Sequence, residues 1–358
     1  MAHSLLFLPD ISGFTDFVSH TEITHSQHII AELLEVMIDA NELDLELAEI
    51  EGDALFFYKE GEIPSFEVLS QQIERMYLAF HNHLRLYEHQ RICDCGACQS
   101  ASLLQIKFFA HAGNIQFLEI KGFKKPHGKE VIVVHRLMKN SVPIQEYLLL
   151  SRDLIQQMDI LNPTLFSDEF QEGIENYDAG EIHYQFSDLG PLRDRLNELP
   201  HYTGHSDSTD PIKVKGKVEL APKELMEIIS NLKYRHLWNT SADKILYQED
   251  HLNRMGTEHV CVINGREVVL ETVSKPSAKN KLVYGEKTKD FPLMKQFTNY
   301  FVVEEENAGS LLTIEGHLNS KNILGTLFKP ILKKKLKGNF EQIFTKLKAV
   351  AEGSPLPI

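Results

Sequence analysis

The segment Phe7-Leu8-Pro9-Asp10-Ile11-Ser12-Gly13-Phe14-Thr15 gives the strongest indication of fold in this sequence of 358 residues. Together with the apolar residues before it, it predicts a strand that ends at an aspartate beside a glycine-containing turn. If the turn opens a helix, its backbone N–H groups can bind a phosphate. The candidate phosphate-binding residues are Ser12, Gly13, Phe14 and Thr15.

A second acidic turn lies further along the chain. Glu51-Gly52-Asp53-Ala54 separates two strand-like runs, so Asp10 and Asp53 are expected at the ends of neighbouring strands. Mg²⁺ and Mn²⁺ bind carboxylate oxygens together with substrate phosphates, and a pair of such ions can activate a hydroxyl and stabilise a leaving phosphate. The structural alternative is that Asp10, followed by Ser-Gly, only forms a turn.

The N-terminal half alternates strand and helix patterns. Apolar spacings of three and four predict helices over about 26–40 and 66–84, and residues 131–134 form a further apolar run. Strands are predicted at 4–8, within 45–58, and at 103–110, 114–120 and 148–150. This order predicts helices that cover a mixed sheet.

Three segments together resemble class III adenylyl and guanylyl cyclases. They are the segment around Asp10, the Gly52-Asp53 turn 43 residues later, and Gly128–Leu137, which follows His111-Ala112-Gly113. The resemblance covers about residues 4–155. It implies a ferredoxin-like α/β sandwich, a nucleoside triphosphate ligand, Mg or Mn as cofactor, and a homodimer whose active sites form between two subunits.

Individual residues can be matched to the cyclase motifs. Asp10 and Asp53 match the metal-binding aspartates, and Ile11 matches the residue whose backbone carbonyl also faces metal. Arg136 matches the catalytic arginine that stabilises phosphate charge in the transition state. The structural alternative for Arg136 is a surface ion pair without a catalytic role.

The sequence also departs from the cyclase pattern. Ile132 stands in place of the catalytic asparagine and cannot hydrogen-bond the ribose. Glu49 stands where adenylyl cyclases have a purine-reading lysine and guanylyl cyclases have a glutamate, and Lys125 falls roughly where adenylyl types have an aspartate. We therefore expect nucleotide binding with slow turnover or none.

A cysteine cluster offers a second candidate metal site. His89, Cys93, Cys95 and Cys98 place four soft ligands within ten residues, a composition that suits Zn²⁺. The alternative is a loop of reduced thiols without metal. Cys261 stands alone.

Charge and composition divide the chain near residue 210. Residues 1–210 carry 14 Lys and Arg against 34 Asp and Glu, whereas residues 211–358 carry 23 against 17. The acidic half argues against nucleic-acid binding. We predict domains at 1–194 and 212–358, joined by a linker over 195–211 that contains Pro200 and Gly204. With no targeting segment and no transmembrane segment in view, a cytoplasmic protein is expected.

The C-terminal half predicts a different α+β domain. A strand at 213–219 and a short helix opened by Pro222 precede a run of strands and a long amphipathic helix over about 323–351, which Pro330 is expected to kink or interrupt. This order resembles the START/polyketide-cyclase-like helix-grip fold, which implies a small apolar ligand between sheet and helix. Candidate cavity residues are Tyr234, His236 and Trp238, with ordinary core packing as the alternative.

Three function hypotheses follow. The first is a divergent cyclase-like protein that binds divalent metal and a nucleoside triphosphate, with weak or no cyclase activity, coupled to a ligand-binding domain. The second is an active nucleotidyl cyclase, for which Glu49 favours GTP. The third is a non-catalytic lipid or small-molecule carrier or sensor.

Overall fold

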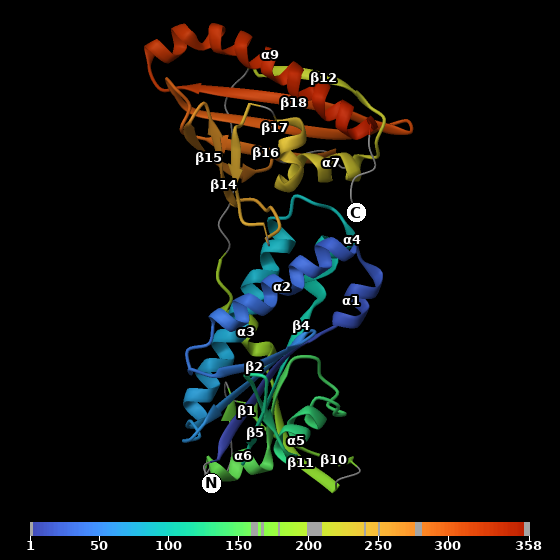
Figure 1. Ribbon diagram of the computed structural model, residues 1–358, viewed down its shortest axis with the longest axis vertical. Coiled ribbons are helices and arrows are strands. Elements are labelled where there is room, and N and C mark those ends of the chain that lie inside the picture. The colour runs from blue at the N-terminus through green and yellow to red at the C-terminus, as the bar shows by residue number, and fades with distance from the viewer. Residues whose placement is uncertain are drawn as a thin grey trace. The chain divides into compact units, whose positions relative to one another are not determined.

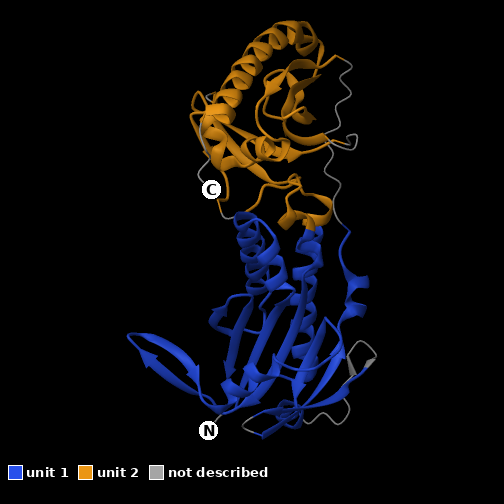
Figure 2. Cartoon of the chain, turned by 90° about the vertical axis from the view of Figure 1, so that its right-hand side faces the viewer, with its two compact units in different colours: residues 1–85, 100–198 blue, residues 86–99, 199–358 orange. Residues whose placement is uncertain are grey.

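The chain folds into two compact units (Figure 2). Residues 1–85 and 100–198 form unit 1, and residues 86–99 and 199–358 form unit 2. The computed structural model describes residues 3–158, 164–165, 168–177, 180–198, 210–239, 241–249, 251–275 and 281–353. Most of the predicted linker, residues 199–209, therefore lies outside the described residues.

Unit 1 is built on a seven-stranded mixed sheet with the order β10-β11-β7-β4-β1-β3-β2 (Figure 1). β4 and β7 run parallel, and the other neighbouring strands run antiparallel. Its strands are β1 (Ser4–Ser12), β2 (Glu46–Glu51), β3 (Ala54–Glu60), β4 (Gln105–Gly113), β7 (Tyr147–Ser151), β10 (Gln171–Tyr177) and β11 (Gly180–Asp188). Two small hairpins pair β5 (Gln116–Ile120) with β6 (Phe123–His127), and β8 (Thr164–Leu165) with β9 (Asp168–Glu169).

The helices of this half of the chain cover both faces of the sheet. Leu5, Leu6, Phe7 and Leu8 of β1 are all buried, and successive strand residues point to opposite faces. The face that carries Leu6 and Leu8 packs on α5, and the long apolar sides of α2 and α3 account for burial of the other. The helices of unit 1 are α1 (Phe14–His20), α2 (Ile23–Asp39), α3 (Phe66–His89), α5 (Lys129–Leu137) and α6 (Arg152–Gln157), with 3₁₀ turns at Ala101–Leu103 and Gly190–Arg195. The short helix α4 (Gly96–Ser100) lies mostly in the segment that belongs to unit 2.

The apolar run at 131–134 belongs to helix α5. Val134 and Leu137 are fully buried, while Ile132 is 54% exposed. The run is therefore one side of a short amphipathic helix whose apolar stripe happens to be locally continuous.

Unit 2 contains a seven-stranded antiparallel sheet with the order β12-β18-β17-β16-β15-β14-β13. Pro222 stands in the first turn of α7, as predicted. The strands are β12 (Ile212–Val218), β13 (Lys244–Leu246), β14 (Glu258–Ile263), β15 (Arg266–Val273), β16 (Lys281–Thr288), β17 (Met294–Glu306) and β18 (Gly309–Ser320). The helices are α7 (Pro222–Ser230), α8 (Arg235–Trp238) and α9 (Ile323–Gly353), with a 3₁₀ turn at Leu232–Tyr234.

The long helix α9 packs across this sheet where two glycines admit aromatic rings. A Cβ atom on Gly216 would lie 2.4 Å from the ring of Phe344, and one on Gly316 would lie 2.7 Å from the ring of Phe340. Pro330 does not end the helix, which continues from residue 323 to residue 353. Within the described part of the chain, every helix is too short or too polar to cross a membrane.

Candidate functional site

The two predicted metal-binding aspartates lie on adjacent parts of unit 1. Asp10 is in β1 and pairs with Ala54 of β3, while Asp53 is in the turn that joins β2 to β3. The backbone N–H of Ile11 donates a hydrogen bond of 3.1 Å to the carbonyl oxygen of Asp53. Strand pairing therefore brings together two residues that are 43 positions apart.

The surroundings of the two carboxyl groups favour their protonated forms. Burial raises the pKa of Asp10 to about 7, helped by the negative charge of Asp53 and opposed by Lys107. Burial also raises the pKa of Asp53, against the effect of its own backbone N–H. A divalent cation would relieve both burial and repulsion of these charges, so the carboxylates fit a hard metal ion.

A glycine-containing turn follows β1 and opens a helix. Gly13 adopts φ 86°, a left-handed conformation that favours glycine, and Phe14 begins α1. Ile11 is 1% exposed, and Thr15 is exposed. Ser12 Oγ is buried and has no hydrogen-bond partner among the described residues, so it can accept or donate a bond to a ligand in this turn.

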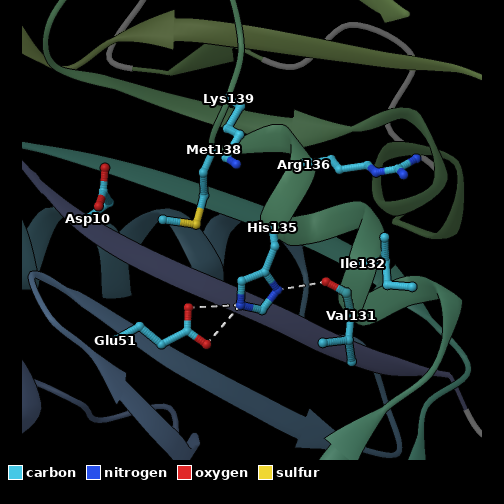
Figure 3. Close-up of a pocket in the computed structure, with 8 residues that line it drawn as sticks. All are labelled: Asp10, Glu51, Val131, Ile132, His135, Arg136, Met138 and Lys139. Atoms are coloured by element: carbon cyan, nitrogen blue, oxygen red, sulfur yellow. Dashed lines mark hydrogen bonds and ion pairs between the residues drawn. The ribbon is translucent and has the colours of Figure 1, made fainter. Parts of the chain in front are cut away.

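An open pocket of about 610 Å³ lies beside Asp10 (Figure 3). On its wall, His135 contacts both carboxylate oxygens of Glu51 through Nε2 at 2.9 Å, and its Nδ1 lies 2.7 Å from the carbonyl oxygen of Val131. Neither His135 nor Glu51 was predicted as a site residue, although His135 is a polar residue directly after the apolar run 131–134. The lining residues are Asp10, Glu51, Val131, Ile132, His135, Arg136, Met138 and Lys139.

Arg136 lines the same pocket, but Figure 3 shows its side chain directed away from Asp10. Its guanidinium carbon lies 5.5 Å from the ring centroid of Tyr177, whose hydroxyl donates to the Arg136 carbonyl at 2.6 Å. Ile132 also lines the pocket and presents no polar atom from its side chain. The residues of the third motif therefore lie on one helix, with the half-buried arginine side chain directed away from Asp10 and toward Tyr177.

Glu49 and Lys125 form an ion pair between β2 and β6. Both side chains are partly exposed, at 40% for Glu49 and 52% for Lys125. The structure thus joins the two residues that the sequence comparison placed at base-reading positions, and it does so with the charges reversed relative to adenylyl cyclases.

A further polar cluster in unit 1 was not predicted. One ligand atom from each of His111, Glu130 and Asp153 lies within 4.8 Å of the others. His111 Nε2 is 2.8 Å from Glu130 Oε2, and Nδ1 is 2.7 Å from Ser151 Oγ. The hydrogen bond from His111 lowers the pKa of Glu130. These residues come from four separate elements, so no spacing in the sequence indicates the group.

The cysteine cluster lies in the part of the chain that belongs to unit 2. The sulfur atoms of Cys93, Cys95 and Cys98 lie within 4.8 Å of one another. His89, at the end of α3, is not part of that group: its side chain is 53% exposed and lies 3.6 Å from Glu88. The structure therefore brings three of the four predicted zinc ligands together.

The candidate cavity residues of unit 2 lie near its core. Trp238 is 1% exposed and donates from Nε1 to the Ile228 carbonyl at 3.0 Å. Tyr234 is half-buried and packs against the same core, and His236 is exposed. These contacts are those of ordinary core and surface residues.

Sequence comparison finds relatives over part of the chain. Residues 30–147 match a family described as "Protein of unknown function (DUF2652)". The chain is 36% identical over 130 residues to "Uncharacterized protein Rv2561/Rv2562" of Mycobacterium tuberculosis. That alignment covers 36% of this chain and 60% of the relative.

Solved structures similar to the chain include nucleotidyl cyclase domains. The adenylyl cyclase CyaB from P. aeruginosa is 13% identical, with 52% of this chain and 94% of that chain covered and a TM-score of 0.37. The guanylate cyclase domain of RhGC from Catenaria anguillulae is 15% identical, with coverages of 52% and 95% and a TM-score of 0.38. TTHA0849 from Thermus thermophilus is 14% identical, with coverages of 40% and 100% and a TM-score of 0.31.

Proposed function

We propose that unit 1 is a divergent class III cyclase-like domain that binds a divalent cation and a nucleoside triphosphate, with weak or no cyclase activity. The adjacency of Asp10 and Asp53 carries this proposal. Two half-buried carboxyl groups with raised pKa values are costly to the folded protein unless something compensates their charge. Asp10, Asp53 and the Ile11 carbonyl would hold Mg²⁺ or Mn²⁺, which when bound neutralises phosphate charge and eases deprotonation of a hydroxyl.

The turn Ser12–Thr15 and Glu49 would contact the nucleotide. The unpartnered hydroxyl of Ser12 and the left-handed turn at Gly13 supply polar groups beside Asp10. Glu49 would read a base edge, in competition with its ion pair to Lys125. The direction of Arg136 away from Asp10 leaves it without a role in the site of its own subunit, and we propose that it acts in the site of a second subunit of a homodimer.

The third motif argues for weak catalysis. Where cyclases need an asparagine to orient the ribose, Ile132 offers only an apolar side chain, and the neighbouring His135 is engaged by Glu51. An enzyme that lacks one positioning contact loses rate by orders of magnitude while its substrate can still bind.

For unit 2 we propose a START-like helix-grip domain that binds a small apolar ligand. The antiparallel sheet packed against one long C-terminal helix supports this assignment. Native mass spectrometry of the full chain from cells tests it: a retained lipid-sized mass supports ligand binding, and protein of the bare chain mass under gentle conditions argues against it.

The experiment for unit 1 is incubation with Mn²⁺ and each of ATP, GTP, CTP and UTP, with nucleotide binding measured by titration calorimetry and products identified by mass spectrometry. Nucleotide binding without product, lost in Asp10→Asn, is the expected result. A cyclic nucleotide that disappears in Asp10→Asn would make the domain an active cyclase. Absence of both binding and product would remove the proposal.

A further inference from the structure

The segment that follows α3, a loop that leads into the short helix α4, holds three thiols in the arrangement of a metal site. Tetrahedral zinc with Zn–S bonds of about 2.3 Å separates its sulfur ligands by roughly 3.8 Å. The sulfur atoms of Cys93, Cys95 and Cys98 already lie within 4.8 Å of one another, so small side-chain movements would close them on one ion.

Backbone amides in the loop point at the sulfur atoms. The N–H of Cys95 donates to Cys93 Sγ at 3.3 Å, and the N–H of Cys98 donates to Cys95 Sγ at 3.4 Å. Such bonds orient sulfur ligands around a metal. The backbone conformation therefore orients the sulfur atoms of Cys93 and Cys95 before any metal binds.

The cluster is shielded from solvent at Cys98, which is 4% exposed. Three thiolates this close repel one another, and Zn²⁺ is the ion whose charge and softness match such a set. All four cysteines of the chain are thiols in the structure.

The same segment is built into the core of unit 2. Ile92 is 6% exposed and belongs to the main core cluster of that unit. The Met255 N–H donates to the Gln90 carbonyl at 2.9 Å, and the Arg254 guanidinium lies 4.9 Å from the ring centroid of Tyr87. Residues 86–99 come between the two segments of unit 1 in the sequence but belong to unit 2, to which these contacts join them.

We propose that Cys93, Cys95 and Cys98 bind one structural Zn²⁺ that keeps residues 90–99 folded against the core of unit 2. A nitrogen or oxygen donor completes the tetrahedron. That donor is not His89, since its ring nitrogens do not lie within 4.8 Å of all three sulfurs. This inference is independent of nucleotide binding by unit 1.

The test uses the full-length protein, purified under reducing conditions, with zinc measured by elemental analysis. We expect about one zinc per chain, as for a closed structural site, in the wild type and in the controls Cys261→Ser and His89→Ala. Cys98→Ser and Cys93→Ser should carry almost none. X-ray absorption of the wild type should show three sulfur ligands and one lighter ligand. Chelation should lower the melting temperature of the wild type and Cys261→Ser, but not of Cys93→Ser.

Because Cys98→Ser could fail to fold, the wild type also provides a direct readout. Chelated protein, reloaded with Zn²⁺ alone, should lose the reactivity of three thiols toward an alkylating reagent. The proposal would be overturned if wild type purified without zinc showed no change in thiol reactivity or melting temperature when Zn²⁺ is added. Zinc retained in the triple Cys93/Cys95/Cys98→Ser variant would also overturn it, as would a disulfide within the cluster in protein purified under reducing conditions.

Discussion

The backbone amide of Ile11 donates a 3.1 Å hydrogen bond to the carbonyl oxygen of Asp53, and this bond joins the end of β1 to the β2–β3 turn. It fixes the two aspartates through the main chain, independently of their side chains. Substitution of either side chain should therefore change the charge of the site without dismantling it, which makes isosteric variants informative.

Asp10→Asn should stabilise the metal-free protein at alkaline pH. The pKa of Asp10 is about 7 in the fold, above its ordinary value of 3.8, so the folded state holds this proton more tightly than the unfolded state. The contribution of Asp10 to the free energy of unfolding is greatest at low pH and falls as pH rises through 7. Allowing for partial exposure, the variant should gain about 2 kcal/mol over wild type between pH 5 and pH 8. Urea unfolding in EDTA measures this, with exposed Asp39→Asn as the control; an equal gain at both pH values would contradict it.

His259 should make unit 2 sensitive to mild acid. Burial, together with the charge of Arg235, lowers its pKa to about 4, although Glu286 lies 3.4 Å away and opposes the shift. The neutral imidazole is thus the folded form, and its stabilising contribution is lost as pH falls below about 6.5. Glu286, whose pKa is about 2, titrates below this range: Arg235 lowers it despite the burial that raises it.

Between pH 7 and pH 5 the wild type should lose about 2 kcal/mol of unfolding free energy that His259→Gln retains. Denaturant unfolding of both proteins at the two pH values measures the difference. Parallel pH profiles would show that His259 becomes charged without cost in the folded state.

Gly316→Ala should destabilise the packing of α9 on the sheet. The added Cβ would meet the Phe340 ring at 2.7 Å, and overpacking of this kind costs about 1–3 kcal/mol. Gly338→Ala is the matched control, since its Cβ would meet no atom within 4 Å and a helix interior gains about 0.5–1 kcal/mol from alanine. Thermal unfolding should separate the two variants in opposite directions; a neutral Gly316→Ala would contradict the observed helix–sheet contact.

Reversal of the Glu49–Lys125 pair should change nucleotide preference. Glu49→Lys with Lys125→Asp keeps the ion pair but exchanges donor and acceptor at the proposed base edge. We expect preference to move from GTP toward ATP by about tenfold, the effect of one exchanged polar contact. Competition binding in Mn²⁺ measures this. An unchanged GTP-to-ATP ratio would place the base elsewhere.

The sequence was most informative where function and local structure use the same residues. The pattern around Asp10 predicted a strand followed by a glycine-containing turn, although the strand continues two residues past the aspartate, to Ser12. The long helices of both halves follow their apolar periods. It was least informative for groups assembled by tertiary packing. His135–Glu51 and His111–Glu130 join residues 84 and 19 positions apart across different elements. The run 131–134 fits a strand or a helix equally well, and only its packing on the sheet settles it.

The measurement that tests the central claim most directly is Mn²⁺ binding to the purified protein by titration calorimetry at pH 6 and pH 8. Protons compete with the metal for Asp10, whose pKa is about 7, so the affinity should be about tenfold higher at pH 8. Asp53→Asn and Asp10→Asn should abolish this binding, and Asp39→Asn should leave it intact. Binding that is independent of pH and survives in Asp10→Asn would contradict a metal site at the Asp10–Asp53 pair.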